Sequence, residues 1–194
     1  MCDTIIKYFQ GYAATSLSAD QIDRINSAFI PKRFRKRQYF LQEGDVCKYG
    51  AFIVKGAMRQ YTVDSKGEEH IIHLAIENWW ANDRESQKTG TPSKYFIDAW
   101  EETDALLITR DRMYELITNI PAVKEWSLKM EEIHFIAVQR RLNEAISLCA
   151  EDRYYELERT YPEFLQRFPQ HIIASYLGIN RDTLSRIRRR TVKG

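Results

Sequence analysis

The sequence predicts an α+β protein in which an antiparallel β-barrel precedes a long helix and a C-terminal helix-turn-helix. Short β-rich runs separated by turn residues occupy the chain between Phe34 and Ile108. After Thr109 the spacing of the apolar residues changes from that of strands to that of a helix. From Pro169 onward the chain has the pattern of two short helices, and the second is strongly basic. The predicted order is therefore sheet, long helix and paired short helices.

The composition is that of a folded protein of one or two domains. The 194 residues are 44% hydrophobic and 29% charged, and the formal net charge is +2. Cys2, Cys47 and Cys149 lack paired spacing, which argues against a disulfide framework and suits a reducing compartment. No apolar run approaches the roughly 20 residues of a spanning helix, and the N-terminus lacks the apolar stretch of a signal peptide. We therefore expect a cytoplasmic protein with no membrane partner.

Local patterns organise the segment that precedes the long helix. Ser18, followed by Asp20 and Gln21, supplies a helix start, and short helices are expected up to Pro31. The turn Asp64-Ser65-Lys66-Gly67 predicts a hairpin, because its glycine suits positive φ. Strands are expected at Tyr39–Leu41, Ala51–Val54, Met58–Val63, His70–Ala75, Tyr95–Ala99 and Leu106–Thr109.

The long helix carries two apolar stripes. The first has the 3, 4, 3, 4 spacing of a coiled-coil seam over roughly two heptads, which predicts a homodimer. The second repeats every seven residues and is expected to lie against the barrel. An amphipathic helix packed wholly within its own monomer stays open as the alternative. The first stripe comprises Val123, Trp126, Met130, Ile133 and Ala137, and the second comprises Leu128, Phe135 and Leu142.

The segment from Pro169 to Arg189 predicts two short helices that cross. Pro169 suits a helix start, Gly178 suits the left-handed residue that ends a helix, and Asn180 is a cap for the next one. Ala174 is small where two crossed helices come closest. The expected core of this unit comprises Ile173, Leu177, Ile179, Leu184 and Ile187.

The second of these helices has a face without core duty, which is strongly basic. Arginines in its first turns suit bidentate bonds to guanine O6 and N7 in the DNA major groove. Arginines near its end suit phosphate neutralisation. A helical hairpin with a merely solvated basic surface is the alternative. The predicted DNA-binding residues are Arg181, Asp182, Thr183, Ser185, Arg186, Arg188, Arg189 and Arg190, with Lys193 as a further phosphate contact.

The segment Asn180-Arg-Asp-Thr-Leu-Ser-Arg-Ile is similar to the recognition helix of the catabolite activator (Crp/Fnr) family of bacterial regulators. The resemblance places Arg181, Asp182 and Arg186 where the family has base-contacting Arg, Glu and Arg. Asp182 departs from that pattern, because its shorter side chain reaches less far toward a cytosine N4 donor. The family's usual target sequence is therefore not assumed.

The resemblance extends to the strands, since Glu43-Gly44-Asp45, Phe52 to Gly56 and Asp64 to Glu68 are similar to the cyclic-nucleotide-binding barrel, a double-stranded β-helix. It implies a sensor barrel with its dimerisation helix over residues 1–140. It implies a helix-turn-helix domain over residues 141–194, lacking most of a wing because the chain ends soon after the recognition helix.

In this family a short helix opened by Gly-Glu, together with a later Arg-Ser or Arg-Thr, holds the nucleotide phosphate. Here Ala81-Asn82 and Ser93-Lys94 stand at those places, so cyclic AMP is not the expected ligand. An aromatic pocket for another small effector and an ordinary aromatic core are both open interpretations. The candidate ligand-binding residues are Trp80, Asn82, Arg84, Ser93, Lys94 and Tyr95.

No catalytic constellation, metal site or cofactor motif emerges. His70 and His73 are spaced to lie on opposite faces of a strand, without a partner at ligand spacing. We predict a homodimeric transcription regulator that binds a palindromic site in double-stranded DNA, with an unidentified small-molecule effector and RNA polymerase as a candidate partner. The alternative is a ligand-binding or protein-interaction module whose helical tail does not read DNA; a barrel enzyme ranks third.

Overall fold

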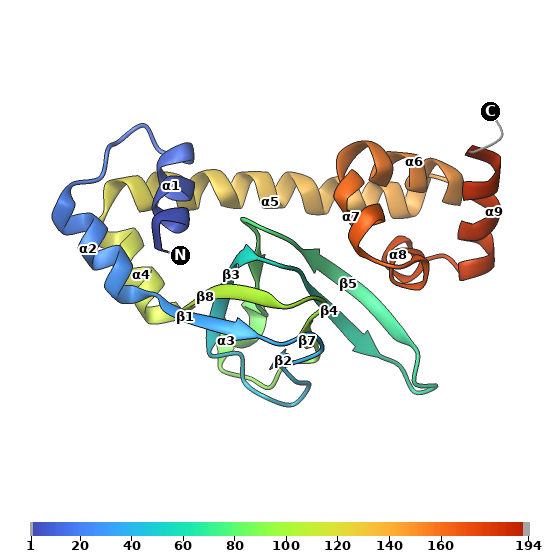
Figure 1. Ribbon diagram of the computed structural model, residues 1–194, viewed down its shortest axis with the longest axis horizontal. Helices are drawn as coiled ribbons and strands as arrows, with labels where there is room; N and C mark the ends of the chain where they lie inside the picture. Colours follow the sequence, from blue (N-terminus) through green and yellow to red (C-terminus); the bar gives the residue numbers. More distant parts are fainter. Residues whose placement is uncertain (1, 192–194) are drawn as a thin grey trace. The chain divides into compact units, whose positions relative to one another are not determined.

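The computed structural model describes residues 2–191 (Figure 1). The chain forms two compact units. The sheet unit comprises the residues up to Tyr61 together with Leu74–Ile133, and the C-terminal unit comprises Thr62–His73 together with the residues from His134 on. Strands β4 (Met58–Val63) and β5 (Glu69–Ala75) and helix α5 (Pro121–Ser147) pass from one unit into the other.

The strands form two four-stranded antiparallel sheets. One has the order β1-β8-β3-β6 and the other β2-β7-β4-β5. The predicted antiparallel architecture is confirmed, but the strands do not close into the expected barrel, because each sheet keeps two edge strands. The remaining strands are β1 (Ile30–Phe34), β2 (Tyr39–Leu41), β3 (Tyr49–Lys55), β6 (Trp80–Ala81), β7 (Phe96–Ala99) and β8 (Thr103–Thr109).

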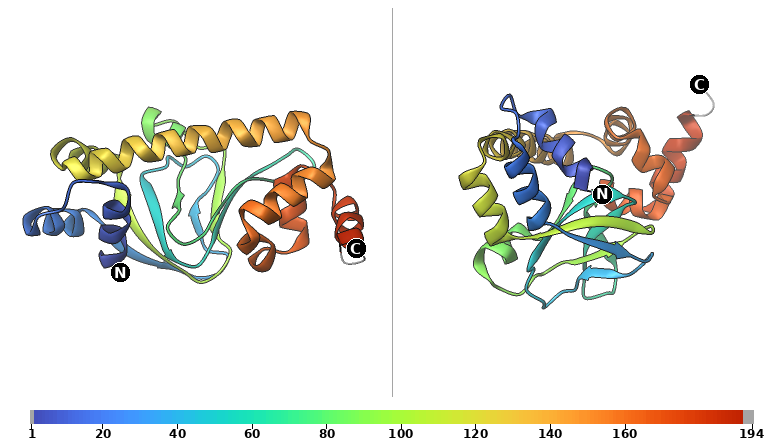
Figure 2. Two further views of the ribbon diagram at one scale, coloured as in Figure 1. Left: turned by 90° about the horizontal axis from the view of Figure 1, so that it is seen from above. Right: turned by 60° about the vertical axis from the view of Figure 1, so that its left-hand side comes forward.

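The helices of the sheet unit are α1 (Cys2–Tyr12), α2 (Ala19–Ala28), α3 (Arg84–Thr89), α4 (Arg110–Asn119) and the first part of α5. The predicted start at Ser18 is confirmed: the Ser18 hydroxyl accepts a bond from the backbone N–H of Gln21, whose side chain accepts from the Ser18 N–H. Both views of Figure 2 show α1 and α2 beside the beginning of α5.

Two apolar clusters form the core of the sheet unit because neighbouring strand residues point to opposite faces. Ile53 and Leu107 join a buried cluster drawn from both sheets. Their neighbours Phe52 and Leu106 join a second cluster with α1, α2, α4 and α5. The first cluster fills the space between the sheets with side chains, including Phe34, Leu41, Met58, Ile97 and Ala99.

The C-terminal unit combines the hairpin Thr62–His73 with the second part of α5 and four further helices. These are α6 (Ala150–Thr160), α7 (Pro162–Arg167), α8 (Gln170–Leu177) and α9 (Arg181–Thr191). Helix α7 was not predicted; Pro162 begins it, where its missing N–H is harmless. Among the described residues, no helix has the length and apolar character needed to cross a bilayer.

Candidate functional site

Helices α8 and α9 form the predicted pair of short helices joined by a tight turn, drawn in red in Figures 1 and 2. Gly178 adopts the left-handed conformation with φ 65° and ψ 36°, and its N–H bonds the carbonyls of Ala174 and Ser175. The Asn180 Oδ1 accepts from the Thr183 N–H at 2.7 Å, which caps α9. Pro169 is the residue before α8 rather than its first helical residue.

The facing sides of α8 and α9 are apolar and buried. Ile173, Ala174 and Leu177 of α8 and Leu184 and Ile187 of α9 are all less than a tenth exposed. Ile179, in the turn, is half-buried. These contacts leave the opposite side of α9 without a role in the core.

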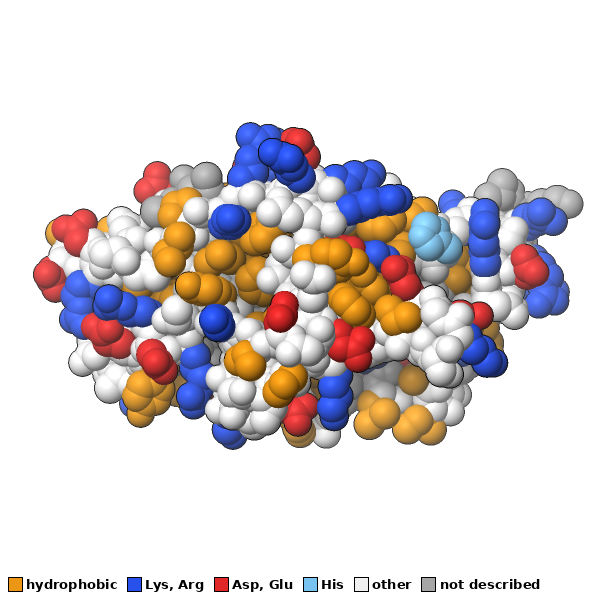
Figure 3. Space-filling model, turned by 90° about the horizontal axis from the view of Figure 1, so that it is seen from below, with side chains coloured by type: hydrophobic (Ala, Val, Ile, Leu, Met, Phe, Trp, Pro, Cys, Tyr) orange, Lys and Arg blue, Asp and Glu red, His pale blue; other side chains and the backbone are white. Residues whose placement is uncertain are grey.

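That opposite side is the candidate DNA-reading face, and it presents Arg181, Asp182, Arg186 and Arg189 to solvent. Within residues 2–191, no carboxylate lies within 4 Å of the guanidinium groups of Arg181, Arg186 and Arg189. The Arg186 Nη2 donates to the Thr183 Oγ1 at 3.1 Å, which steadies its guanidinium near the face. Ser185 and Thr183 flank it, half-buried. Lys and Arg side chains gather at the right-hand end of Figure 3, where α9 lies.

Arg188 and Arg190 differ from this set because they contact α6 of the same unit. The Arg190 Nη1 lies 3.6 Å from the Glu151 Oε2. Burial raises the pKa of the Tyr154 hydroxyl on α6, and the Glu158 carboxylate raises this pKa further. The positive charge of Arg188 lowers the same pKa, because Arg188 lies near Tyr154. These two arginines therefore border the face rather than belong to its centre, and Lys193 lies outside the described residues.

The candidate ligand residue Ser93 is hydrogen-bonded to the residue that caps α3. Ser93 is buried, and its Oγ donates to the Asp83 Oδ2 at 2.7 Å. The Asp83 Oδ1 accepts from the Ser86 N–H at 3.1 Å, so this carboxylate caps the N-terminus of α3. An acidic side chain of the chain itself therefore occupies the positive end of the short helix. Asp83 was not singled out from the sequence, although Asp is a preferred N-cap residue and Glu85 follows in the first turn.

The other candidates serve several local interactions. Trp80 packs in the aromatic core, with its ring centroid 5.4 Å from Phe52 and 5.8 Å from Trp126. The Asn82 amide donates to the Gln87 Oε1 at 2.7 Å, and the Arg84 Nη2 lies 3.5 Å from the Glu131 Oε1. Lys94 is exposed and Tyr95 is half-buried. Ligand binding by these residues stays a prediction.

The predicted dimer seam on α5 needs correction. Val123 is fully buried and Trp126 is 6% exposed, both within the core of their own chain. The centroid of the Trp126 ring lies 4.6 Å from that of Phe9. Both rings belong to the apolar cluster in which α1 and α5 pack against Phe52 and Leu106 of the sheet. Met130 accepts a hydrogen bond from the Tyr8 hydroxyl, whereas Ile133 and Ala137 are exposed. The N-terminal part of the seam therefore stabilises the monomer.

The second stripe, which was expected to lie against the barrel, is exposed instead. Leu128, Phe135 and Leu142 are 61%, 61% and 60% exposed, and Ile146 is 76% exposed. Their spacing of seven, seven and four residues places all of them on one face of the helix. We call these four residues the α5 stripe.

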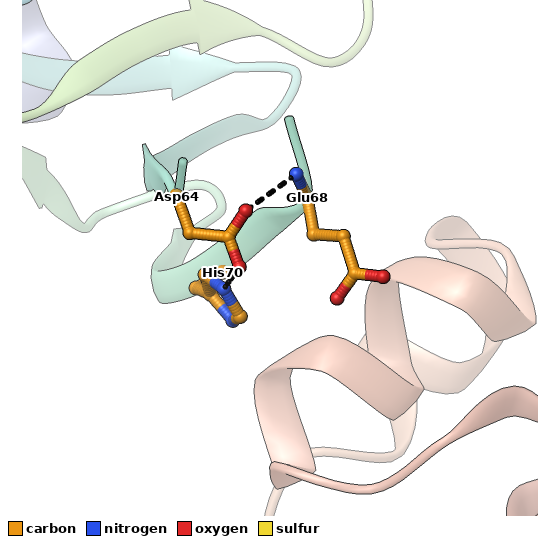
Figure 4. A group of neighbouring side chains, drawn as sticks. All are labelled: Asp64, Glu68 and His70. Carbon is orange, nitrogen blue, oxygen red and sulfur yellow. Dashed lines mark hydrogen bonds and ion pairs between the residues drawn. The ribbon is translucent and has the colours of Figure 1, made fainter. Parts of the chain in front are cut away.

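The hairpin turn brings together Asp64, Glu68 and His70, whose ligand-type atoms lie within 4.8 Å of one another (Figure 4). The Asp64 Oδ1 accepts from the N–H groups of Lys66 and Glu68, and its Oδ2 lies 3.0 Å from the His70 Nε2. These bonds lower the pKa of Asp64, the one to His70 most. Hydrogen bonds of this kind, in which an Asp side chain accepts from backbone N–H groups a few residues later, are typical of hairpin turns. We therefore assign no ion to this group.

His73 gives the C-terminal unit a pH-dependent stability. Burial, the charge of Arg141 and the nearby His134 lower the pKa of His73 from 6.5 to about 4. As the pH falls from 6.5 to about 4, His73 becomes protonated in the unfolded chain but stays neutral in the folded chain. The folded state is therefore destabilised relative to the unfolded state in that pH range. We expect a loss of about 1 to 3 kcal/mol in urea unfolding, and expect His73→Gln to remove this part of the pH dependence. If the free energy of unfolding of wild type and of His73→Gln fell equally over this pH range, the lowered pKa would not belong to His73.

Comparisons with known proteins agree with this architecture. Residues 31–119 match the cyclic nucleotide-binding domain family. FixK2 of Bradyrhizobium japonicum is 18% identical over 85% of each chain, with a TM-score of 0.66. A transcriptional regulator assigned to the Crp/Fnr family, from Eubacterium rectale, is 17% identical over 92% of this chain and 85% of that one, with a TM-score of 0.65.

A double mutant of CooA from Carboxydothermus hydrogenoformans is 18% identical over 93% of this chain and 81% of that one, with a TM-score of 0.66. The comparison with curated protein sequences found no match. At these identities the solved structures show the fold. Residues 31–119 therefore match the cyclic nucleotide-binding domain family, and the chain shares the fold of these solved structures.

Proposed function

We propose that this chain is a homodimeric transcription regulator whose two α9 helices read a palindromic site in double-stranded DNA. The observation that carries the proposal is the exposed face of α9, where Arg181, Arg186 and Arg189 lie opposite a buried apolar face. A guanidinium group without a carboxylate partner keeps its donors for guanine O6 and N7 or for phosphate oxygens.

The residues of the face differ in what they offer DNA. Arg181 and Arg186 suit base contacts, because the first turns of a recognition helix approach the base edges. Arg188, Arg189 and Arg190 suit phosphates, which add affinity without sequence preference. Asp182 accepts hydrogen bonds and disfavours nearby phosphates, so it contributes selectivity rather than affinity.

The second copy is proposed to meet the first along the α5 stripe. Large apolar side chains that are more than half exposed are stabilised when another apolar surface covers them. Two such helices side by side follow the coiled-coil geometry of a two-fold dimer. The dimer presents two α9 helices to successive major grooves, about 34 Å apart. RNA polymerase remains a candidate partner, and the cytoplasm the proposed location.

The sensor effector is proposed not to be cyclic AMP. Asp83 holds the N-terminus of α3 with its own negative charge, which repels a phosphate there. We expect calorimetric titration with cyclic AMP to give no binding heat, with a cyclic-AMP-binding protein as the positive control. Micromolar affinity would contradict the role assigned to Asp83.

The proposed function is tested by selecting duplexes from a random-sequence DNA pool with the purified full chain. We expect enrichment of a palindrome whose affinity falls steeply as salt rises, since each neutralised phosphate releases counterions. Mobility shifts at several salt concentrations measure that slope. No enrichment, or an affinity independent of salt, would favour a protein-interaction module instead.

A further inference from the structure

The outer edge of β5 is paired with a side chain of α8. The sheet order places β5 at an edge, where backbone groups lack a neighbouring strand. The Ser175 hydroxyl accepts from the Ile71 N–H at 2.9 Å and donates to the Glu69 carbonyl at 2.8 Å. One hydroxyl therefore uses its donor and one acceptor position on two backbone groups of the same strand edge.

Arg141 of α5 joins the same hairpin to the same helix. Its guanidinium donates to the carbonyl of Ile72 and, at 3.2 Å, to the carbonyl of Tyr176. It also lies over the Tyr176 ring, 4.1 Å from the centroid. Three segments of the C-terminal unit, namely the hairpin, α5 and α8, are thus tied together at one place. We call these contacts the Ser175–Arg141 clamp.

The clamp acts on α9 through α8. Ile173 and Leu177 of α8 and Leu184 and Ile187 of α9 are buried, and α8 packs against α9, so we expect the two helices to move as one body. The backbone between α5 and α6 consists only of Leu148 and Cys149, and a link of this kind permits rotation. The two side chains donate to backbone carbonyls, and the Ser175 hydroxyl also accepts from a backbone N–H; these bonds remove that freedom.

We infer that Ser175 and Arg141 are positioning residues for DNA reading, holding α8 and α9 on the β5 edge so that both recognition helices of a dimer are oriented before they meet a palindrome. This rests on the proposed function. A preoriented pair engages the second half-site at a high effective concentration, whereas a loosened pair loses affinity through orientational entropy. Binding to a single half-site uses one recognition helix only and does not require the two helices to be oriented relative to each other. Its affinity therefore does not depend on the clamp.

The test compares wild type, Ser175→Ala and Ser175→Thr on two DNA probes. The first is the palindromic duplex that wild type enriches from a random pool, and the second is that duplex with one half scrambled. We expect Ser175→Ala to weaken palindrome binding by about tenfold while half-site binding stays unchanged. Ser175→Thr restores palindrome binding because it keeps the hydroxyl. Arg141→Met is expected to act in the same direction as Ser175→Ala.

Ser147→Ala is the matched control, since the Ser147 hydroxyl bonds Asn143 and takes no part in the clamp. Thermal unfolding of each variant confirms that the fold survives. Unchanged palindrome binding by Ser175→Ala, or equal losses on both probes, would overturn the inference while leaving the proposed function standing. Failure of wild type to enrich any duplex would overturn both.

Discussion

Arg186→Ala is expected to weaken binding of the selected palindrome by about 1–3 kcal/mol per half-site and to relax selectivity at one base pair. The guanidinium of Arg186 is exposed, held near the face by Thr183 and unpaired with any carboxylate within residues 2–191. Loss of a bidentate contact leaves a guanine acceptor pair without its donors. Competition mobility shifts with duplexes altered at single positions measure both the affinity and the selectivity.

Arg190→Ala is the matched control for that experiment. Arg190 already lies 3.6 Å from Glu151, so its removal is expected to cost less and to act equally on all sequences. It should also make the salt dependence of binding slightly shallower. If the two variants were indistinguishable in selectivity, Arg186 would be a phosphate contact only and the base-reading role would fail.

Phe135→Glu combined with Leu142→Glu is expected to convert the dimer into a monomer at micromolar concentration. Both side chains are about three-fifths exposed in the isolated chain, and covering each one contributes about 2 kcal/mol per subunit. Two carboxylates facing their copies across a two-fold axis add repulsion and desolvation cost. Sedimentation equilibrium measures the mass, and palindrome binding should fall with it while half-site binding remains.

Tyr114→Glu is the control, because Tyr114 is 70% exposed and belongs to α4, not to the helix that carries the α5 stripe. Trp126→Ala provides the opposite contrast. Trp126 is buried in its own chain, so that change is expected to lower the unfolding temperature of the sheet unit rather than dissociate a dimer. A dimer that survives both charged substitutions on the stripe would place the subunit contact elsewhere.

Local patterns predicted the elements that have clear boundaries. Tyr39–Leu41 and Met58–Val63 are strands with the predicted ends. Turn residues bound Met58–Val63 on both sides, and Glu43-Gly44-Asp45 follows Tyr39–Leu41. The two-residue strand Trp80–Ala81 is too short to show alternation, and the six-residue helix α7 is too short to show a helical period. The cap, glycine turn and core of α8 and α9 were predictable because all lie within one short window.

Contacts between distant segments were not predictable. Periodicity showed two stripes on α5 but not which one a partner covers, since Val123 and Trp126 meet an apolar surface made by residues far along the chain. The bond between Ser175 and Ile71 joins residues 104 positions apart, and nothing in the local sequence marks Ser175. The cap role of Asp83 is local, whereas its bond to Ser93 depends on the folded sheet.

The central claim is that the exposed arginines of α9 contact base edges in the major groove. Dimethyl sulfate probing of guanine N7 in the selected duplex tests it most directly, because N7 is accessible only from that groove. The prediction is two clusters of protected guanines about one helical turn apart, lost in Arg181→Ala combined with Arg186→Ala. Guanines that stay reactive when the chain is bound, or protection that persists in the double variant, would contradict it.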